Sequence, residues 1–279
     1  MKDMERKQRA KAAAAAEKEA QAKAAQKVSR MAYKNNLGGR REAYAASFIA
    51  APCLAVFGLW TWATWYEIEQ RERRSGKPHK EGWFKLLGIA TPPPPITYKD
   101  MSLNFTQITA LLLQGHQQPH VLVTSAFSHF DAAHLGLNML GLYLASINIP
   151  LPKSIGTGRF VGLFVLSGLA GNLVQIAANV YCYNKTNDAG FVLARSLGAS
   201  GGISGLVATA CLWKPRRTIL MPGFMIDGIP TWTYLLLTIG YDVWGMETML
   251  SQEGRGQGQQ TAHGAHLGGA AIGVTAFFK

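Results

Sequence analysis

The sequence predicts an all-α membrane protein, a bundle of six transmembrane helices behind a basic N-terminal arm. Only 16% of the 279 residues are charged, against about 25% in soluble domains. The charges are concentrated, so several apolar runs of bilayer-spanning length carry none. Much of the net charge of +12 lies in residues 1–42, which we expect to form an exposed arm, helical or disordered.

The first predicted span covers residues 43–66, which contain no charged residue. A long polar connection, residues 67–131, follows, and its four prolines at 92–95 exclude a helix interior there. Five further apolar runs are bounded by charges or by the end of the sequence. They are residues 132–150, 160–183, 196–213, 230–246 and 262–278. The run at residues 230–246 is the weakest candidate for a membrane span, because Asp242 lies near its end.

Basic residues set the predicted orientation of these spans. Lys153 and Arg159 follow the second span, and three basic residues at 214–217 follow the fourth. Positive charge favours the cytoplasmic or matrix side of a membrane. The N-terminal arm and these connections are therefore expected on that side. Spans two, four and six would then all enter from the opposite face.

A glycine-rich run with two serines opens the fourth span. Residues 197–205 read Leu-Gly-Ala-Ser-Gly-Gly-Ile-Ser-Gly. Backbone N–H groups at a helix start are free to bind an anion, so Ser200 could serve as nucleophile and oxyanion donor. Ser204 lies one turn deeper, which favours Ser200. The competing interpretation is that the glycines serve helix packing alone.

The second span begins with His134-Leu-Gly-Leu-Asn138. The i, i+4 spacing places the imidazole and the carboxamide on one face of the helix. Both groups donate hydrogen bonds, so both are candidates to stabilise an oxyanion beside Ser200. An ionisable group inside a span is costly and indicates a functional site.

The sixth span begins with His266, followed by Gly269 and Gly273. Glycines four residues apart form a small-xxx-small face on which another helix can pack closely. Gly201, at the start of the fourth span, offers part of the matching groove. Such packing would bring His266 within hydrogen-bond reach of the Ser200 hydroxyl, as a general base.

Together these motifs resemble the rhomboid intramembrane serine proteases. They are G-A-S-G at 198–201, H-x-x-x-N at 134–138 and H-x-x-G-x-x-x-G at 266–273. The resemblance covers residues 43–279, and the stretch 101–139 is similar to the mitochondrial presenilin-associated rhomboid-like branch. It implies a rhomboid six-helix domain and a catalytic dyad without aspartate. The implied residues are Ser200 and His266 for catalysis, His134 and Asn138 for the oxyanion, and Gly198, Gly201, Gly269 and Gly273 for helix packing.

The resemblance also implies a serine-type endopeptidase that needs no cofactor or metal. Its substrates would be single-pass transmembrane proteins in the lipid bilayer, entering past span five and the loop 254–260. The mitochondrial inner membrane is the expected location, and another endomembrane is the alternative. One departure concerns Ser204, which stands where relatives often carry a bulky residue stacked on the histidine. The orientation of the His266 ring must therefore depend on something else.

Two other functions remain open at this stage. A rhomboid-like protein without activity would bind membrane clients, although such relatives typically lack the serine or the histidine. A transporter would be expected to show an inverted repeat or broken helices, and neither is evident. Nucleic-acid binding is not expected, because no aromatic or groove-binding motif accompanies the basic charge.

Several residues near these motifs receive structural interpretations. His263 and His266 could form a metal pair with His129 or His134, but we expect His263 to be an interfacial residue. We expect His129 to buttress the site from a loop. Asp242 could be an acid that supports the site residues without contacting substrate, but we expect it to be a helix-end carboxylate that faces water. The sequence also contains three scattered cysteines, which are too few for a zinc site or a disulfide framework.

Overall fold

The computed structural model describes residues 44–76, 92–147, 155–216, 218–219, 229–250 and 262–277, and this part of the chain is predominantly helical. The N-terminal arm and the glycine-rich loop 254–260 lie outside the described residues. Each of the six predicted spans overlaps a helix. Two helices, Tyr44–Ser75 and Thr157–Thr186, are long and apolar enough to cross a membrane, judged by length and composition.

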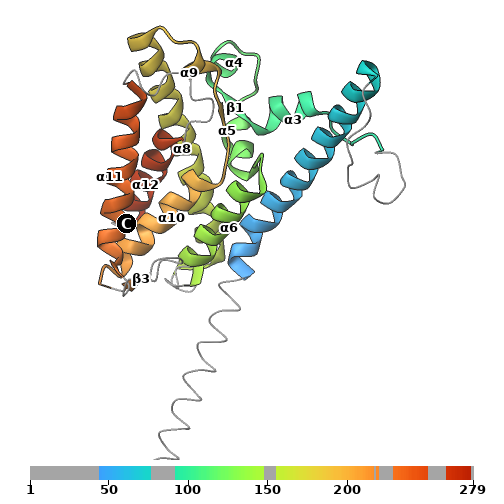
Figure 1. Cartoon of the computed structure of the whole chain (residues 1–279). Helices are drawn as coiled ribbons and strands as arrows, with labels where there is room; N and C mark the ends of the chain where they lie inside the picture. The colour runs from blue at the N-terminus through green and yellow to red at the C-terminus, as the bar shows by residue number, and fades with distance from the viewer. Residues whose placement is uncertain are drawn as a thin grey trace, which may run out of the picture.

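Helix Tyr44–Ser75 runs obliquely beside the rest of the molecule (Figure 1). The connection that follows contains short elements rather than an irregular loop. They are α3 (Tyr98–Phe105), β1 (Gln107–Ile108), α4 (Thr109–Leu113), α5 (Val121–Thr124) and the 3-10 helix η1 (Ser125–Phe127). Trp60 joins the first helix to this layer, because its buried indole N–H donates to Ser128 Oγ at 2.6 Å.

The remaining elements form the bundle. They are α6 (Ala132–Ile147), α8 (Thr157–Thr186), α9 (Gly190–Leu193), β2 (Arg195–Ser196), α10 (Ser200–Trp213), β3 (Thr218–Ile219), β4 (Ile229–Pro230), α11 (Thr231–Leu250) and α12 (His263–Phe277). Strand β1 pairs antiparallel with β2, and β3 pairs antiparallel with β4. The first pair opposes Gln107 to Ser196 and thereby ties the segment before α10 to the connection.

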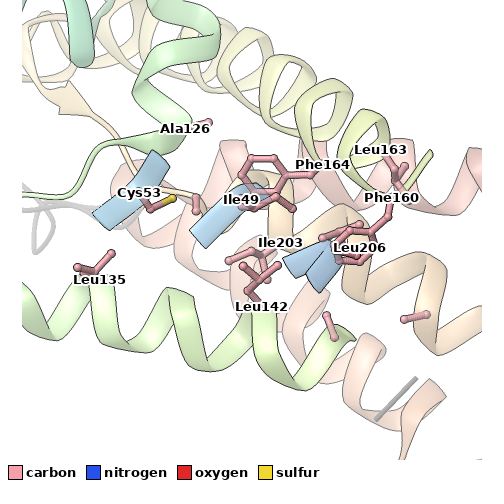
Figure 2. Packing of buried hydrophobic residues seen from close by; sticks show 14 residues of the cluster. Ile49, Cys53, Ala126, Leu135, Leu142, Phe160, Leu163, Phe164, Ile203 and Leu206 are labelled. Atoms are coloured by element: carbon pink, nitrogen blue, oxygen red, sulfur yellow. The ribbon is translucent and has the colours of Figure 1, made fainter. Parts of the chain in front are cut away.

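Helix α10 lies at the centre of the bundle and contacts α6, α8, α11 and α12. Its Ile203 and Leu206 pack with Phe160 and Phe164 of α8 (Figure 2). Ile49 of the first helix joins the same cluster. Close packing of this kind holds helices together in lipid, where the hydrophobic effect between them is small.

Glycines set the contact between α10 and α12. Gly269 lies against the carbonyl oxygen of Gly201, and Gly273 lies against that of Gly205. A side chain at either α12 position would collide with the α10 backbone. Thr209 adds a hydrogen bond across the interface, because its hydroxyl donates to the Gly273 carbonyl at 2.8 Å. Three of the four predicted packing glycines, Gly201, Gly269 and Gly273, lie at this contact, whereas the fourth, Gly198, lies against the His134 ring.

Candidate active site

The segment before α10 is held by hydrogen bonds that place Ser200 at the first position of the helix. Gly198 has a φ of 126°, which favours glycine, and its N–H donates to the Ser125 carbonyl at 2.9 Å. The N–H of Ala199 lies 3.4 Å from Nε2 of His129, which is fully buried. His129 therefore supports the turn that carries Ser200, in line with the expected buttress.

The candidate nucleophile and base lie within hydrogen-bond distance. Nε2 of His266 on α12 is 2.9 Å from Oγ of Ser200 on α10. The glycine contact between the two helices makes this approach possible, because Gly201 is the residue after Ser200 and Gly269 lies three residues after His266. A neutral imidazole nitrogen at this distance can accept the hydroxyl proton.

For Asp242 on α11 the preferred expectation is wrong, and the alternative of a supporting acid fits its position. It is 6% exposed rather than facing water, and its Oδ1 lies 2.9 Å from Nδ1 of His266. The same oxygen lies 2.8 Å from Nδ1 of His263, which is 8% exposed rather than interfacial. The cause is Gly245, which leaves room for the His263 ring to lie directly against α11.

A signal for Asp242 was present in the sequence. It is the one charged residue between positions 231 and 246, within an otherwise apolar helix. A lone carboxylate in such a helix indicates a function by default, and the same rule pointed to the histidines. The sequence did not show which side of α11 the carboxylate occupies.

His134 and Asn138 lie on α6 beside the candidate nucleophile. The His134 ring lies so close to Gly198 that a Cβ there would be 2.8 Å from its Cε1 and Nε2 atoms. Asn138 is 6% exposed, and its Nδ2 donates to the His134 carbonyl at 3.0 Å within the helix. Both side chains line the same cavity as Ser200. Asp131 caps this helix by accepting from the His134 N–H at 2.7 Å.

His129, in the loop before α6, has a strongly perturbed proton affinity. Burial, and to a smaller extent the neighbouring His134, lower its pKa to about 4, while Asp131 acts in the opposite direction. The His129 and His134 rings meet edge to face, with centroids 5.0 Å apart. His129 is therefore neutral near neutral pH and can accept the Ala199 hydrogen bond.

A cavity of about 1240 Å³ is lined by Ser200, His266, Asp242, His134 and Asn138. Helices α6, α10, α11 and α12 contribute to its wall, and so does the segment 193–197. Arg195 lies in that segment with its guanidinium 6.0 Å from the Tyr98 ring and 5.9 Å from the Phe130 ring. The volume exceeds that of a typical small-molecule site and is sufficient for several residues of a peptide.

The structure brings together only some of the residues of the alternative metal site. One atom each from Asp242, His263 and His266 lie within 4.8 Å of one another, which could suit a cation by distance alone. The separations of 2.8 and 2.9 Å are those of hydrogen bonds, so these atoms are already paired. His129 and His134, the expected third ligands, do not belong to this group.

Fold and site together define a helical membrane protein in which a serine and a histidine meet at the wall of a cavity. The Rhomboid domain model matches residues 116–279, more than half of the sequence. The chain therefore belongs to the Rhomboid family and is an integral membrane protein.

Similar curated proteins agree with this family. RHOMBOID-like protein 12, mitochondrial, of Arabidopsis thaliana is 28% identical over 57% of this chain and 46% of its own length. Rhomboid protein 1, mitochondrial, of Saccharomyces cerevisiae is 30% identical over 68% and 51%. Presenilin-associated rhomboid-like protein, mitochondrial, of Rattus norvegicus is 28% identical over 55% and 36%. The chain thus spans about half or less of the length of these relatives.

Proposed function

We propose that this protein is an intramembrane serine endopeptidase. The observation that carries the proposal is the 2.9 Å approach of His266 Nε2 to Ser200 Oγ inside the cavity. As Oγ attacks the substrate carbonyl carbon, His266 accepts its proton. The resulting oxyanion is stabilised by the Ser200 N–H together with His134 and Asn138. His266 then protonates the leaving amine, and the peptide bond breaks to give an acyl-enzyme.

The second half of the reaction regenerates the serine. Water gives a proton to His266 and attacks the acyl carbon, and the serine oxygen leaves with that proton. The reaction therefore needs water at a membrane-embedded site. The cavity supports this requirement, because Ser200 and His266 both line it, so water within it lies beside the reacting groups.

The proposed substrates are single-pass transmembrane proteins held in the bilayer. The enzyme would be a six-helix rhomboid domain, residues 43–279, with the arm of residues 1–42 on the matrix or cytoplasmic side. Helices α6 and α11 line the cavity on either side of α10. The proposed route for a substrate helix is the opening that forms when α11 moves away from the rest of the bundle. The names of the relatives place those proteins in mitochondria, which supports the mitochondrial inner membrane for this one.

Cleavage of a membrane-embedded substrate tests this proposal. The full chain would be reconstituted in liposomes with a single-pass protein whose transmembrane segment contains small, helix-weakening residues. We expect cleavage by the wild type and by Ser204→Ala, but none by Ser200→Ala or His266→Ala. Binding without cleavage by the folded wild type, across a panel of such substrates, would instead support an inactive protein that binds membrane clients.

A further inference from the structure

We propose that Asp242 is the positioning residue of the His266 base, and that His263 holds the Asp242 carboxylate in place. The inference rests on the proposed function and extends it from two residues to a connected set of four. In this set Ser200 donates to His266, and both His266 and His263 donate to Asp242. It replaces the expected dyad without aspartate.

The hydrogen-bond geometry fixes which nitrogen of His266 carries the proton. Oδ1 of Asp242 is a pure acceptor when ionised, so the Nδ1 atom 2.9 Å away must be the donor. A neutral imidazole has a single N–H, which leaves Nε2 with a free lone pair. That lone pair points to Ser200 Oγ at 2.9 Å. The arrangement selects the tautomer that a general base requires.

Asp242 also stabilises the product of the proton transfer. When His266 takes the serine proton it becomes an imidazolium, with its positive charge beside the carboxylate. Both side chains are largely buried, with 19% and 9% of their side-chain surface exposed, so the attraction is only weakly screened. The pair therefore favours the charged state that forms as Ser200 attacks.

The Asp242 contact supplies an orientation for the histidine ring that the sequence left unexplained. Ser204, on α10, offers no bulky surface on which the ring could stack, and it lines the same cavity. In place of stacking, His266 is held at both ring nitrogens, by Ser200 and by Asp242. Hydrogen bonds at both nitrogens define the plane and the rotation of the ring.

His263 restrains the carboxylate from the other side. Its ring lies against Gly245, and its centroid is 5.3 Å from that of Tyr241. Its Nδ1 reaches the same oxygen of Asp242 at 2.8 Å. A carboxylate buried in an apolar helix is stable only when donors compensate for its lost hydration. His263 provides such a donor throughout, while His266 takes part in proton transfer.

In the described part of the chain other ionisable groups line the same cavity, and Cys182 of α8 lines a neighbouring pocket with α11 and α12. The list comprises Asp131 and His134 at the start of α6, Arg195 before α10, Cys211 on α10, and Tyr234 and Tyr241 on α11. None of these groups is hydrogen-bonded to the Asp242 carboxylate. Removal of the Asp242 charge should therefore act mainly on His266.

The rate of covalent labelling by a fluorophosphonate, measured across pH, tests the inference. Asp242→Asn retains the shape but can offer an N–H to Nδ1, which favours the wrong tautomer. We expect labelling at neutral pH to fall by about 10²–10⁴-fold, as for an aspartate of this kind. The pH of half-maximal labelling should also fall, because the imidazolium loses its counter-charge. His263→Phe keeps the ring and removes the donor, and should reduce the rate by about tenfold.

Glu247→Gln is the matched control, because it removes a carboxylate from an exposed position on the same helix. It should leave both the rate and the pH profile unchanged. Folded Asp242→Asn protein that labels at the wild-type rate with the wild-type profile would overturn the inference. A wild type that does not label at Ser200 would instead overturn the proposed function, so the two failures are distinguishable.

A second measurement needs no variant and so does not depend on how Asp242→Asn folds. Nitrogen chemical shifts of 15N-histidine-labelled wild type report which ring nitrogen is protonated. We expect His263 and His266 both to carry the proton on Nδ1 at neutral pH, with assignment from His263→Phe. A proton on Nε2 of His266 would overturn the inference.

Discussion

Gly269 on α12 lies directly against the carbonyl oxygen of Gly201 on α10. Gly201 follows Ser200 in the sequence, and Gly269 lies three residues, almost one helical turn, after His266. One of the close backbone contacts between the two helices therefore lies where the candidate nucleophile meets the candidate base. The packing of α10 on α12 therefore also sets the 2.9 Å separation of Ser200 Oγ from His266 Nε2.

The first prediction is that Gly269→Ala separates the two residues. The added methyl group collides with the Gly201 backbone, and backbone cannot move aside as a flexible side chain can. We expect a destabilisation of about 1–3 kcal/mol, typical of overpacking, and at least a tenfold loss of labelling. Thermal unfolding in detergent and labelling rates measure both. Gly162→Ala, on α8, is the control, because a Cβ there meets no atom within 4 Å; equal effects of the two variants would contradict this prediction.

The second prediction concerns the turn before α10. Gly198→Ala combines a strained φ with a methyl group 2.8 Å from the His134 ring. Gly115→Ala is the matched variant, because Gly115 has a φ of 75° but open space around it. Both should lower thermal stability, by about 1–2 kcal/mol for the strain, but only Gly198→Ala should abolish labelling. Full activity in Gly198→Ala would show that the position of the His134 ring is unimportant.

The third prediction assigns the oxyanion donors. Without His134 or Asn138 the oxyanion loses a donor, and removal of one such donor typically costs about 10²–10³ in rate. Each alanine variant should therefore cleave substrate far more slowly, with little change in thermal stability. Leu140→Ala, at an exposed position of the same helix that does not line the cavity, should cleave normally. Unchanged cleavage by both His134→Ala and Asn138→Ala would remove these residues from the mechanism.

The fourth prediction is a loss of stability in acid caused by His129. Its pKa is lowered from 6.5 to about 4 in the folded protein, so between these pH values the unfolded chain binds the extra proton. Stability is therefore fully present above pH 6.5 and falls as the pH approaches 4, by about 3 kcal/mol. The melting temperature of His129→Gln should depend less on pH over this range. His116→Gln, at an exposed loop position, should retain the wild-type dependence; a His129→Gln profile that does the same would contradict the assignment.

Much of the helical framework could be predicted from hydropathy and charge. The run expected at residues 160–183 lies within α8, Thr157–Thr186, because charged residues bound the apolar stretch on both sides. The interior of the connection before α6 could not be predicted in this way. Its short elements depend on tertiary hydrogen bonds, such as those of buried Gln117, which accepts from the Ile108 N–H and donates to the Thr106 carbonyl.

The candidate site was predictable only where glycines and polar residues recur at helical spacing. That pattern identified Ser200 and His266 as residues that could meet. It could not identify the position of Asp242, which is 24 residues from His266 and belongs to a different helix. The direction in which Asp242 points depends on how α11 is rotated against α12, and Gly245 allows that rotation by admitting the His263 ring.

The most direct test of the central claim is to identify the residue that a fluorophosphonate modifies. The detergent-purified full chain would be labelled and digested, and the modified peptide would be mapped by mass spectrometry. We predict a single adduct on Ser200, which is absent from Ser200→Ala and His266→Ala and present in Ser204→Ala. An adduct on Ser204, or no adduct on folded wild type while an active rhomboid protease labels in parallel, would contradict the account.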